Sequence, residues 1–123
     1  MNTNDNALRR PELLQFVRSK GKMVPLVENG RIIRDRKGKV VMLREKGAPR
    51  GVLVAGMVDG EVRIGWSYTN KKLGDSFDKE FGINVSMNRL NKPSRLQIPH
   101  KVMKEINNSF IPRCEEYFGV KFA

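Results

Sequence analysis

The sequence predicts an α+β fold: an antiparallel β meander of about five short strands, with one N-terminal helix and two C-terminal helices. Between residues 23 and 68, β-rich runs alternate with turn residues. The segments before and after carry helix start signals and apolar residues at helical spacing. The length of 123 residues suits one domain. We therefore expect a single basic α+β domain over residues 1–123, with residues 1–8 flexible.

The first predicted element is a short helix over about residues 11–19. Pro11 suits the first helical turn, where a missing N–H costs nothing, and Glu12 favours the positive end of the helix dipole. Residues 20–22, Lys-Gly-Lys, supply the glycine and the cations that are typical of a helix end. The apolar stripe expected to dock on the sheet consists of Leu13, Phe16 and Val17.

Five strands are expected next, over residues 23–27, 31–34, 39–44, 51–58 and 61–68. Turn residues separate them at Asn29-Gly30, at residues 35–38 and at Asp59-Gly60. The Asp-Gly pair is the strongest hairpin signal, because both of its positions tolerate positive φ. The strand over residues 51–58 carries apolar side chains on both faces, which predicts a central strand covered on both sides.

Alternation in the last strand predicts one buried face, formed by Val62, Ile64, Trp66 and Tyr68. This pattern places Trp66 in the core. The alternative places Trp66 and Tyr68 at a sheet edge, where aromatic rings stack on unpaired bases. The shared face with Val62 and Ile64 favours the core position.

Two helices are expected after the sheet. Asp75 is expected to cap the first, over about residues 76–90. Its apolar stripe is Phe77, Phe81 and Val85. Gly82 costs about 1 kcal/mol in mid-helix, which indicates either a break or close packing there. The second helix spans about residues 99–118, and Pro112 must kink or divide it. Its stripe is Val102, Ile106, Phe110 and Tyr117.

Charge is the strongest functional signal in the sequence. The chain has 24 Lys and Arg against 13 Asp and Glu, a net charge of +11. The first 50 residues carry 13 basic and 5 acidic groups, residues 51–88 carry 4 and 5, and residues 89–123 carry 7 and 3. A surface with this excess of positive charge attracts polyanions from a distance, so we expect an anionic partner.

The densest run of charge lies between residues 31 and 50, with eight cations and two acids. A hairpin with a basic, glycine-containing tip can lie along a phosphate backbone or enter a groove. The alternative is a solvated edge strand whose cations only prevent edge-to-edge pairing. With a short basic loop after the last strand, the predicted nucleic-acid-binding residues are Arg31, Arg34, Arg36, Lys37, Lys39, Arg44, Lys46, Arg50, Lys71 and Lys72.

The sequence shows no convincing catalytic site. His100 and Cys114 are the only residues of their kinds, and on one helix they lie about 21 Å apart, too far for a thiol–imidazole pair. Cys114 is expected to be a small buried hydrophobe. The acids at Asp59, Glu61 and Asp75 match no nuclease spacing, and a metal-dependent nuclease is the residual enzymatic alternative. We expect no enzymatic activity, no metal and no cofactor.

The single cysteine excludes an intrachain disulfide and indicates a reducing compartment. Residues 1–6 are polar and lack the basic-then-apolar pattern of a signal peptide. No segment approaches about 18 consecutive apolar residues. We therefore expect a cytoplasmic location and no membrane insertion.

One segment resembles a known group of proteins. The run Trp66-Ser67-Tyr68-Thr69-Asn70, followed by Asp75, Phe77, Lys79, Gly82 and Arg89, is similar to a strand-to-helix segment of small proteins of tailed bacteriophages. The resemblance covers about one fifth of the chain, residues 66–89. The resemblance implies a phage accessory protein that acts inside the infected bacterial cell. It implies no active-site residues for this chain.

Taken together, these features predict a non-enzymatic nucleic-acid-binding protein that uses a basic β-hairpin surface. Basic hairpins serve DNA and RNA alike, and both are open at this point. The alternative from another class is a small inhibitor or interaction protein that docks on an acidic surface of a host protein such as a nuclease or polymerase. The same positive surface would serve either function.

Overall fold

The computed structural model describes residues 8–69, 76–92 and 96–122, and these form two compact units. The sheet unit comprises the described residues up to Val17 and from Pro49 onward. The second unit, residues 18–48, is called the basic ribbon below because cations dominate its charge. The fold is mixed α and β with antiparallel strand pairing, as the sequence predicts.

A three-stranded sheet organises the sheet unit, in the order β1 (Leu13–Arg18), β6 (Pro49–Val58) and β7 (Glu61–Tyr68). β6 and β7 form an antiparallel hairpin. Its turn residues, Asp59 and Gly60, have φ of 51° and 80°, the left-handed values that an Asp-Gly turn requires. The predicted limits of the last strand and the central place of β6 are both confirmed.

The predicted N-terminal helix over residues 11–19 is wrong, because this segment contains β1. As a strand, it places alternate side chains on opposite faces of the sheet. Leu13 and Val17 are buried in one core cluster, and Leu14 and Phe16 pack against the other. A helix would have buried a single stripe. Burial on two faces therefore outweighs the local helix signals.

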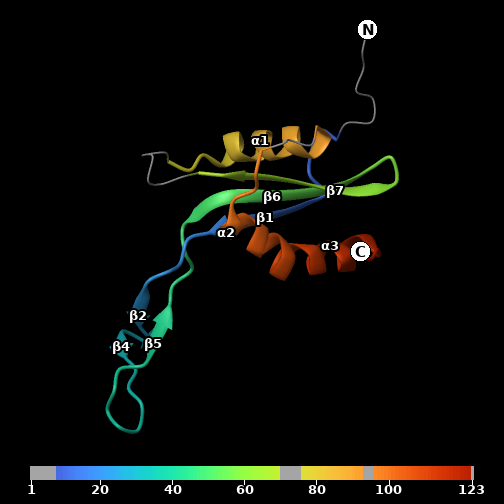
Figure 1. The fold of residues 1–123 in the computed structure, drawn as a ribbon. Coiled ribbons are helices and arrows are strands. Elements are labelled where there is room, and N and C mark those ends of the chain that lie inside the picture. The colour runs from blue at the N-terminus through green and yellow to red at the C-terminus, as the bar shows by residue number, and fades with distance from the viewer. Residues whose placement is uncertain (1–7, 70–75, 93–95, 123) are drawn as a thin grey trace. The chain divides into compact units, whose positions relative to one another are not determined.

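Helices cover both faces of the sheet (Figure 1). On one face lies α1 (Lys79–Asn91), and on the other lies a continuous helix made of α2 (His100–Glu105), the π-helical turn η2 (Ile106–Phe110) and α3 (Ile111–Phe118). A core cluster fills each side of β6. The α1 side buries Val52, Val54, Val58, Met87 and Leu90. The opposite side buries Leu13, Val17, Leu53, Ala55, Val102, Ile106, Phe110 and Cys114.

Small residues bring α1 very close to the sheet. A Cβ atom added to Gly65 of β7 would lie 1.9 Å from the backbone oxygen of Ser86, so any larger residue would push the helix away. A Cβ atom added to Gly82 would lie 3.2 Å from the hydroxyl oxygen of Ser67. The buried Ser86 hydroxyl lies 3.1 Å from the Val52 carbonyl oxygen. Close packing, one of the two explanations predicted for Gly82, is therefore confirmed.

The predicted apolar stripe of this helix is wrong at Phe81, which is 68% exposed. The buried positions of α1 are Gly82, Ser86, Met87 and Leu90. Phe81 precedes Gly82 on the helix and lies outside this buried set. The helix is capped by Asp78, whose carboxylate accepts a hydrogen bond from the Phe81 N–H at 3.0 Å. The predicted cap, Asp75, lies outside the described residues.

The final helix has the predicted extent, from residue 100 to residue 118. The disturbance predicted at Pro112 takes the form of the π-helical turn η2 directly before it. Tyr117 departs from the prediction, because it is 58% exposed while Cys114 is fully buried. Ile111 and Phe118 also pack against the core beside Cys114, so the buried face is centred on these three residues and Tyr117 lies at its margin. In the described part of the chain, no helix is both long enough and apolar enough to cross a membrane.

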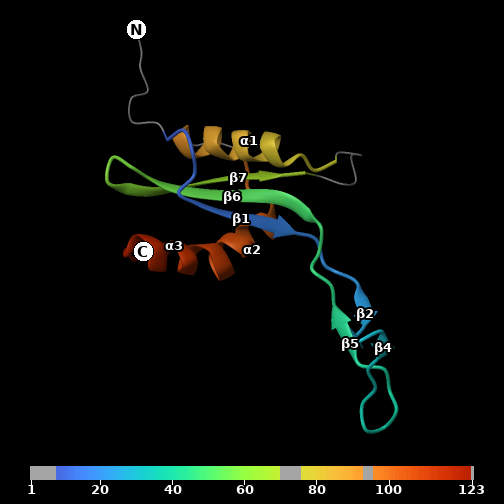
Figure 2. The same ribbon diagram turned by 180° about the vertical axis from the view of Figure 1, so that it is seen from behind.

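The basic ribbon is a set of short antiparallel pairs. β2 (Met23–Pro25) pairs with β5 (Met42–Arg44), and β3 (Val27–Glu28) pairs with β4 (Arg31–Ile32). Figures 1 and 2 show β2 and β5 side by side from both directions. The prediction of one five-stranded meander is therefore wrong, because the strands belong to three separate sheets.

Candidate nucleic-acid interface

The basic ribbon gathers most of the net charge in a segment without a core. Its 31 residues include ten Lys and Arg against three Asp and Glu, so one quarter of the chain carries +7 of the net +11. No residue from 18 to 48 is fully buried. A segment that buries no side chain completely and carries this charge is typical of a surface for a polyanion.

A tight turn at residues 35–39 forms the ribbon tip, and Asp35 holds it. The Asp35 carboxylate accepts hydrogen bonds from the backbone N–H groups of Lys37 at 2.9 Å and Lys39 at 3.0 Å. Gly38 has a φ of 84°, which a residue with a side chain rarely adopts. The turn leaves the side chains of Arg36, Lys37 and Lys39 exposed. Asp35, the only acid of the tip, therefore hydrogen-bonds to the backbone of its own turn.

Seven of the ten predicted nucleic-acid-binding residues are exposed on the ribbon, namely Arg31, Arg34, Arg36, Lys37, Lys39, Arg44 and Lys46. Arg34 donates a hydrogen bond to the carbonyl oxygen of Gly38, and Arg44 donates one to that of Gly21. These bonds orient the guanidinium groups, and a carbonyl acceptor leaves their charge unneutralised.

The other three predicted residues lie elsewhere. Arg50 belongs to the sheet unit and is half-buried, and its Nη2 atom is buried without a hydrogen-bond partner among the described residues. Lys71 and Lys72 lie outside the described residues, so their role stays a prediction. The ribbon adds three cations that sequence reasoning assigned to a helix end or left out, namely Arg18, Lys20 and Lys22.

The ribbon also exposes large apolar side chains. Nine such side chains are exposed among the described residues, and five of them lie on the ribbon. The five are Met23, Val27, Ile32, Met42 and Leu43, each between 43% and 53% exposed. Sequence reasoning missed them, because it assigned these residues to a sheet with a covered face. Their exposure makes the ribbon surface both cationic and apolar.

Two glycines allow the ribbon strands to meet near its ends. A Cβ atom added to Gly21 would lie 1.6 Å from the backbone oxygen of Glu45, and one added to Gly47 would lie 1.6 Å from that of Ser19. Any side chain at either position would force the two backbones apart. These glycines therefore allow the two backbones to come this close.

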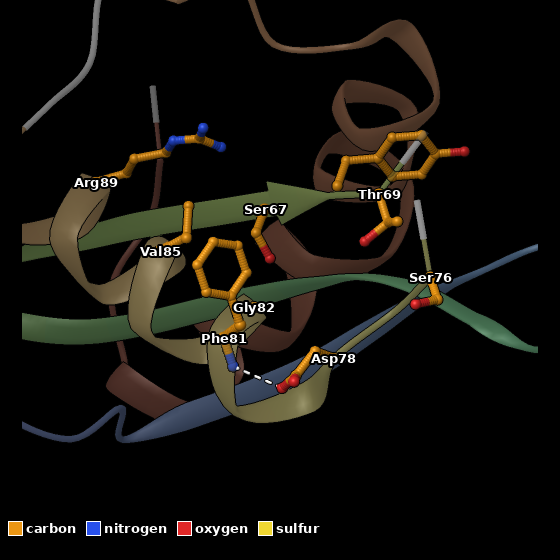
Figure 3. Close-up of a pocket in the computed structure, with 9 residues that line it drawn as sticks. Ser67, Thr69, Ser76, Asp78, Phe81, Gly82, Val85 and Arg89 are labelled. Atoms are coloured by element: carbon orange, nitrogen blue, oxygen red, sulfur yellow. Dashed lines mark hydrogen bonds between the residues drawn. The ribbon is translucent and has the colours of Figure 1, made fainter. Parts of the chain in front are cut away.

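A hollow of about 590 Å³ opens in the sheet unit where α1 begins (Figure 3). Its lining includes Asp78, Phe81 and Arg89 from α1 and its cap, with Ser67 from β7. The Ser67 hydroxyl is buried without a hydrogen-bond partner among the described residues, while Asp78 serves as the helix cap. Ser67 and Asp78 therefore do not form an assembled pair of nucleophile and base.

Arg89 of α1 reaches the exposed edge of the sheet and covers Trp66. Its Nη1 donates a hydrogen bond to the Trp66 carbonyl oxygen at 3.0 Å, and its guanidinium carbon lies 3.9 Å from the ring centroid. Burial lowers the pKa of Arg89 below its ordinary value. The indole also packs against the core cluster. Stacking of a base on Trp66 would therefore have to displace Arg89.

The Cys114 thiol is buried, and burial raises its pKa from 9.0 to about 11, although the charge of Arg113 opposes the shift. An activated nucleophile requires the opposite shift. We expect native Cys114 to react with Ellman's reagent at pH 8 far more slowly than the same thiol in urea. Rapid labelling of the native protein would contradict this assignment.

The raised pKa also predicts how stability depends on pH. The folded protein holds the thiol proton more tightly than the unfolded chain does. Its contribution to stability is therefore complete below about pH 9 and is lost as the pH rises toward about 11. Urea unfolding at pH 8 and pH 10.5 measures the loss, and Cys114→Ala, which has no thiol to titrate, should lose less.

Within residues 8–69, 76–92 and 96–122, no three His, Cys, Asp or Glu side chains gather where they could hold a metal ion. Residues 66–89, for which the sequence predicts a resemblance to phage proteins, begin at the end of β7 and end within α1, where Gly82 and Arg89 lie. Compared with models of protein families, with curated proteins and with solved structures, the chain matches none.

Proposed function

We propose that this chain is a non-enzymatic nucleic-acid-binding protein that contacts phosphates through the basic ribbon. The observation that supports the proposal is the charge of +7 on 31 residues, none of them fully buried. Each cation that meets a phosphate releases condensed counterions, which drives binding. The same proposal includes action in the cytoplasm of a phage-infected bacterial cell, which the resemblance of residues 66–89 implies.

Reversing two charges at the ribbon tip, Arg36→Glu with Lys37→Glu, is expected to weaken duplex binding about 60-fold at about 0.1 M salt. Each phosphate contact raises the affinity at about 0.1 M salt by about 0.9 log units relative to about 1 M salt. The loss of two contacts therefore lowers the affinity by about 1.8 log units. The slope of log affinity against log salt should shrink by about 1.8. Fluorescence-anisotropy titrations over a salt series, with duplex DNA, single-stranded DNA and structured RNA, measure both quantities.

The matched control reverses two exposed lysines of the sheet unit, Lys101→Glu with Lys104→Glu. Each reversal changes the charge by two, so both double variants carry +7 in place of +11. Equal weakening by both variants would show that only the overall charge matters and would remove the ribbon from the proposal. No binding of any of the three nucleic acids at low salt would overturn the proposed function.

A second candidate function is docking on an acidic surface of another protein, such as a host nuclease or polymerase. The five exposed apolar side chains of the ribbon favour it, because protein interfaces bury apolar side chains at their centre. The two candidates differ in their response to competing polyanions. A complex with one protein of fixed stoichiometry that persists in excess heparin supports docking, whereas heparin displaces nucleic acid.

A further inference from the structure

We infer that the basic ribbon binds duplex DNA in the major groove, where its exposed apolar side chains contact thymine methyl groups. The inference rests on the proposed function and names the kind of nucleic acid and the groove. Phosphate contacts alone need only cations. The ribbon carries exposed apolar side chains among its cations, and these favour a partner that is apolar as well as anionic.

Strand register places apolar and basic side chains on one face. In the β2–β5 pair, Met23 is opposite Arg44 and Pro25 is opposite Met42. Alternate residues of a strand share a face, so these four side chains point the same way. Met23 is 49% exposed and Met42 is 43% exposed. An arginine beside exposed methionines offers hydrogen-bond donors and apolar surface to the same partner.

The β3–β4 pair adds an exposed apolar pair nearer the tip. Val27 is directly opposite Ile32, and the two side chains are 53% and 50% exposed. A direct cross-strand pair lies close together, so the valine and the isoleucine form one apolar contact surface. The tip cations follow within a few residues. Phosphate-binding and base-contacting groups therefore occur together on one short ribbon.

Groove dimensions select duplex DNA. Two paired strands lie about 4.8 Å apart, before their side chains are counted. The major groove of B-form DNA is about 12 Å wide and admits a two-stranded ribbon, whereas the minor groove is only about 6 Å wide. The major groove of duplex RNA is deep and narrow, and side chains do not reach its bases. The major groove of DNA is therefore the groove that fits.

The chemistry of the base edges selects the contact. The major groove displays hydrogen-bond donors and acceptors from every base pair, but its apolar group is the C5-methyl of thymine. Aliphatic side chains gain by covering that methyl, and covering one is worth about fourfold in affinity. The ribbon is therefore expected to prefer duplexes rich in thymine.

Replacing thymine by deoxyuridine tests the inference, because it removes the methyl group and keeps the charge and the base pairing. The full chain is titrated by anisotropy with an alternating A–T duplex and with the same duplex carrying uracil. We expect the uracil duplex to bind about tenfold or more weakly, for two or more methyl contacts. Val27→Ser with Ile32→Ser should bind the thymine duplex more weakly and show a smaller preference for it, because Met23 and Met42 remain to contact methyl groups.

Met103→Ser, at an exposed methionine of α2, is the control and should keep the preference of the unmodified chain. Equal affinity of the unmodified chain for the two duplexes would overturn the inference and leave the proposed function standing. The comparison of the two duplexes uses the unmodified chain alone, so it tests the inference even if the double serine variant misfolds. Tighter binding of single strands or structured RNA would also overturn the inference. Binding of no nucleic acid would overturn the proposed function itself.

Discussion

Replacing residues 20–47 by Asn-Gly is expected to lower the affinity for nucleic acid on the order of 10³-fold or more at about 0.1 M salt. The shortened chain should still fold. The Ser19 N–H already donates to the Ala48 carbonyl oxygen at 2.9 Å, so a two-residue Asn-Gly turn can close the two ends. Both core clusters are built from residues outside 18–48. Anisotropy titrations measure the affinity, and thermal melts measure the folding.

The control for this deletion keeps the ribbon and matches the charge. The deletion removes nine cations and three acids, so the net charge falls from +11 to +5. Reversing three exposed lysines of the sheet unit, Lys101, Lys104 and Lys121, also gives +5. We expect this variant to bind much more tightly than the deletion variant. If the two bind equally, the interface is not on the ribbon.

Phe110→Ala is expected to destabilise the fold by about 3–5 kcal/mol, enough to consume much of the stability of a domain of this size. Phe110 is fully buried and is the largest side chain of its core cluster that water does not reach. Its removal leaves a cavity between the final helix and the sheet, because the surrounding side chains relax only in part. Urea unfolding measures the change in free energy.

The same substitution at an exposed phenylalanine is the control. Phe81→Ala removes an equal volume from a ring that is 68% exposed, so stability should change by about 0.5 kcal/mol or less. A loss of less than about 1 kcal/mol for Phe110→Ala would show that the final helix contributes little to the core. A large loss for Phe81→Ala would show that the register of α1 against the sheet is different.

Elements whose signals are local could be predicted from the sequence. The Asp59-Gly60 turn requires left-handed backbone at two adjacent residues, and the chain supplies the residue types that adopt it. The limits of strand β7 follow from its own alternation, but the prediction of one buried face is incomplete, because α1 also covers the opposite face, where Gly65 and Ser67 are buried. The final helix follows from apolar residues at four-residue spacing. Each of these patterns lies within one short segment, so no knowledge of a distant partner is needed.

The N-terminal strand could not be predicted in this way. Residues 11–19 carry a helical stripe and helix end signals, and these are the only signals that a local pattern offers. What overrides them is pairing with a strand far along the chain, where the Glu12 N–H donates to the Ala55 carbonyl oxygen at 3.0 Å. Long-range backbone pairing and burial on two faces stabilise the strand, and neither is visible in the segment itself.

For the candidate interface, the sequence alone was enough to predict a cluster of cations, because charge is a property of composition and the cluster is contiguous between residues 31 and 50. The exposed apolar side chains of the ribbon emerged only from the fold. Val27 and Ile32 have the same local pattern as buried strand residues, and their burial depends on whether another layer covers them. Helices cover both faces of β6, whereas the ribbon strands pair two by two and bury no side chain completely. Burial belongs to the packing of layers, so it is settled by residues distant in the chain.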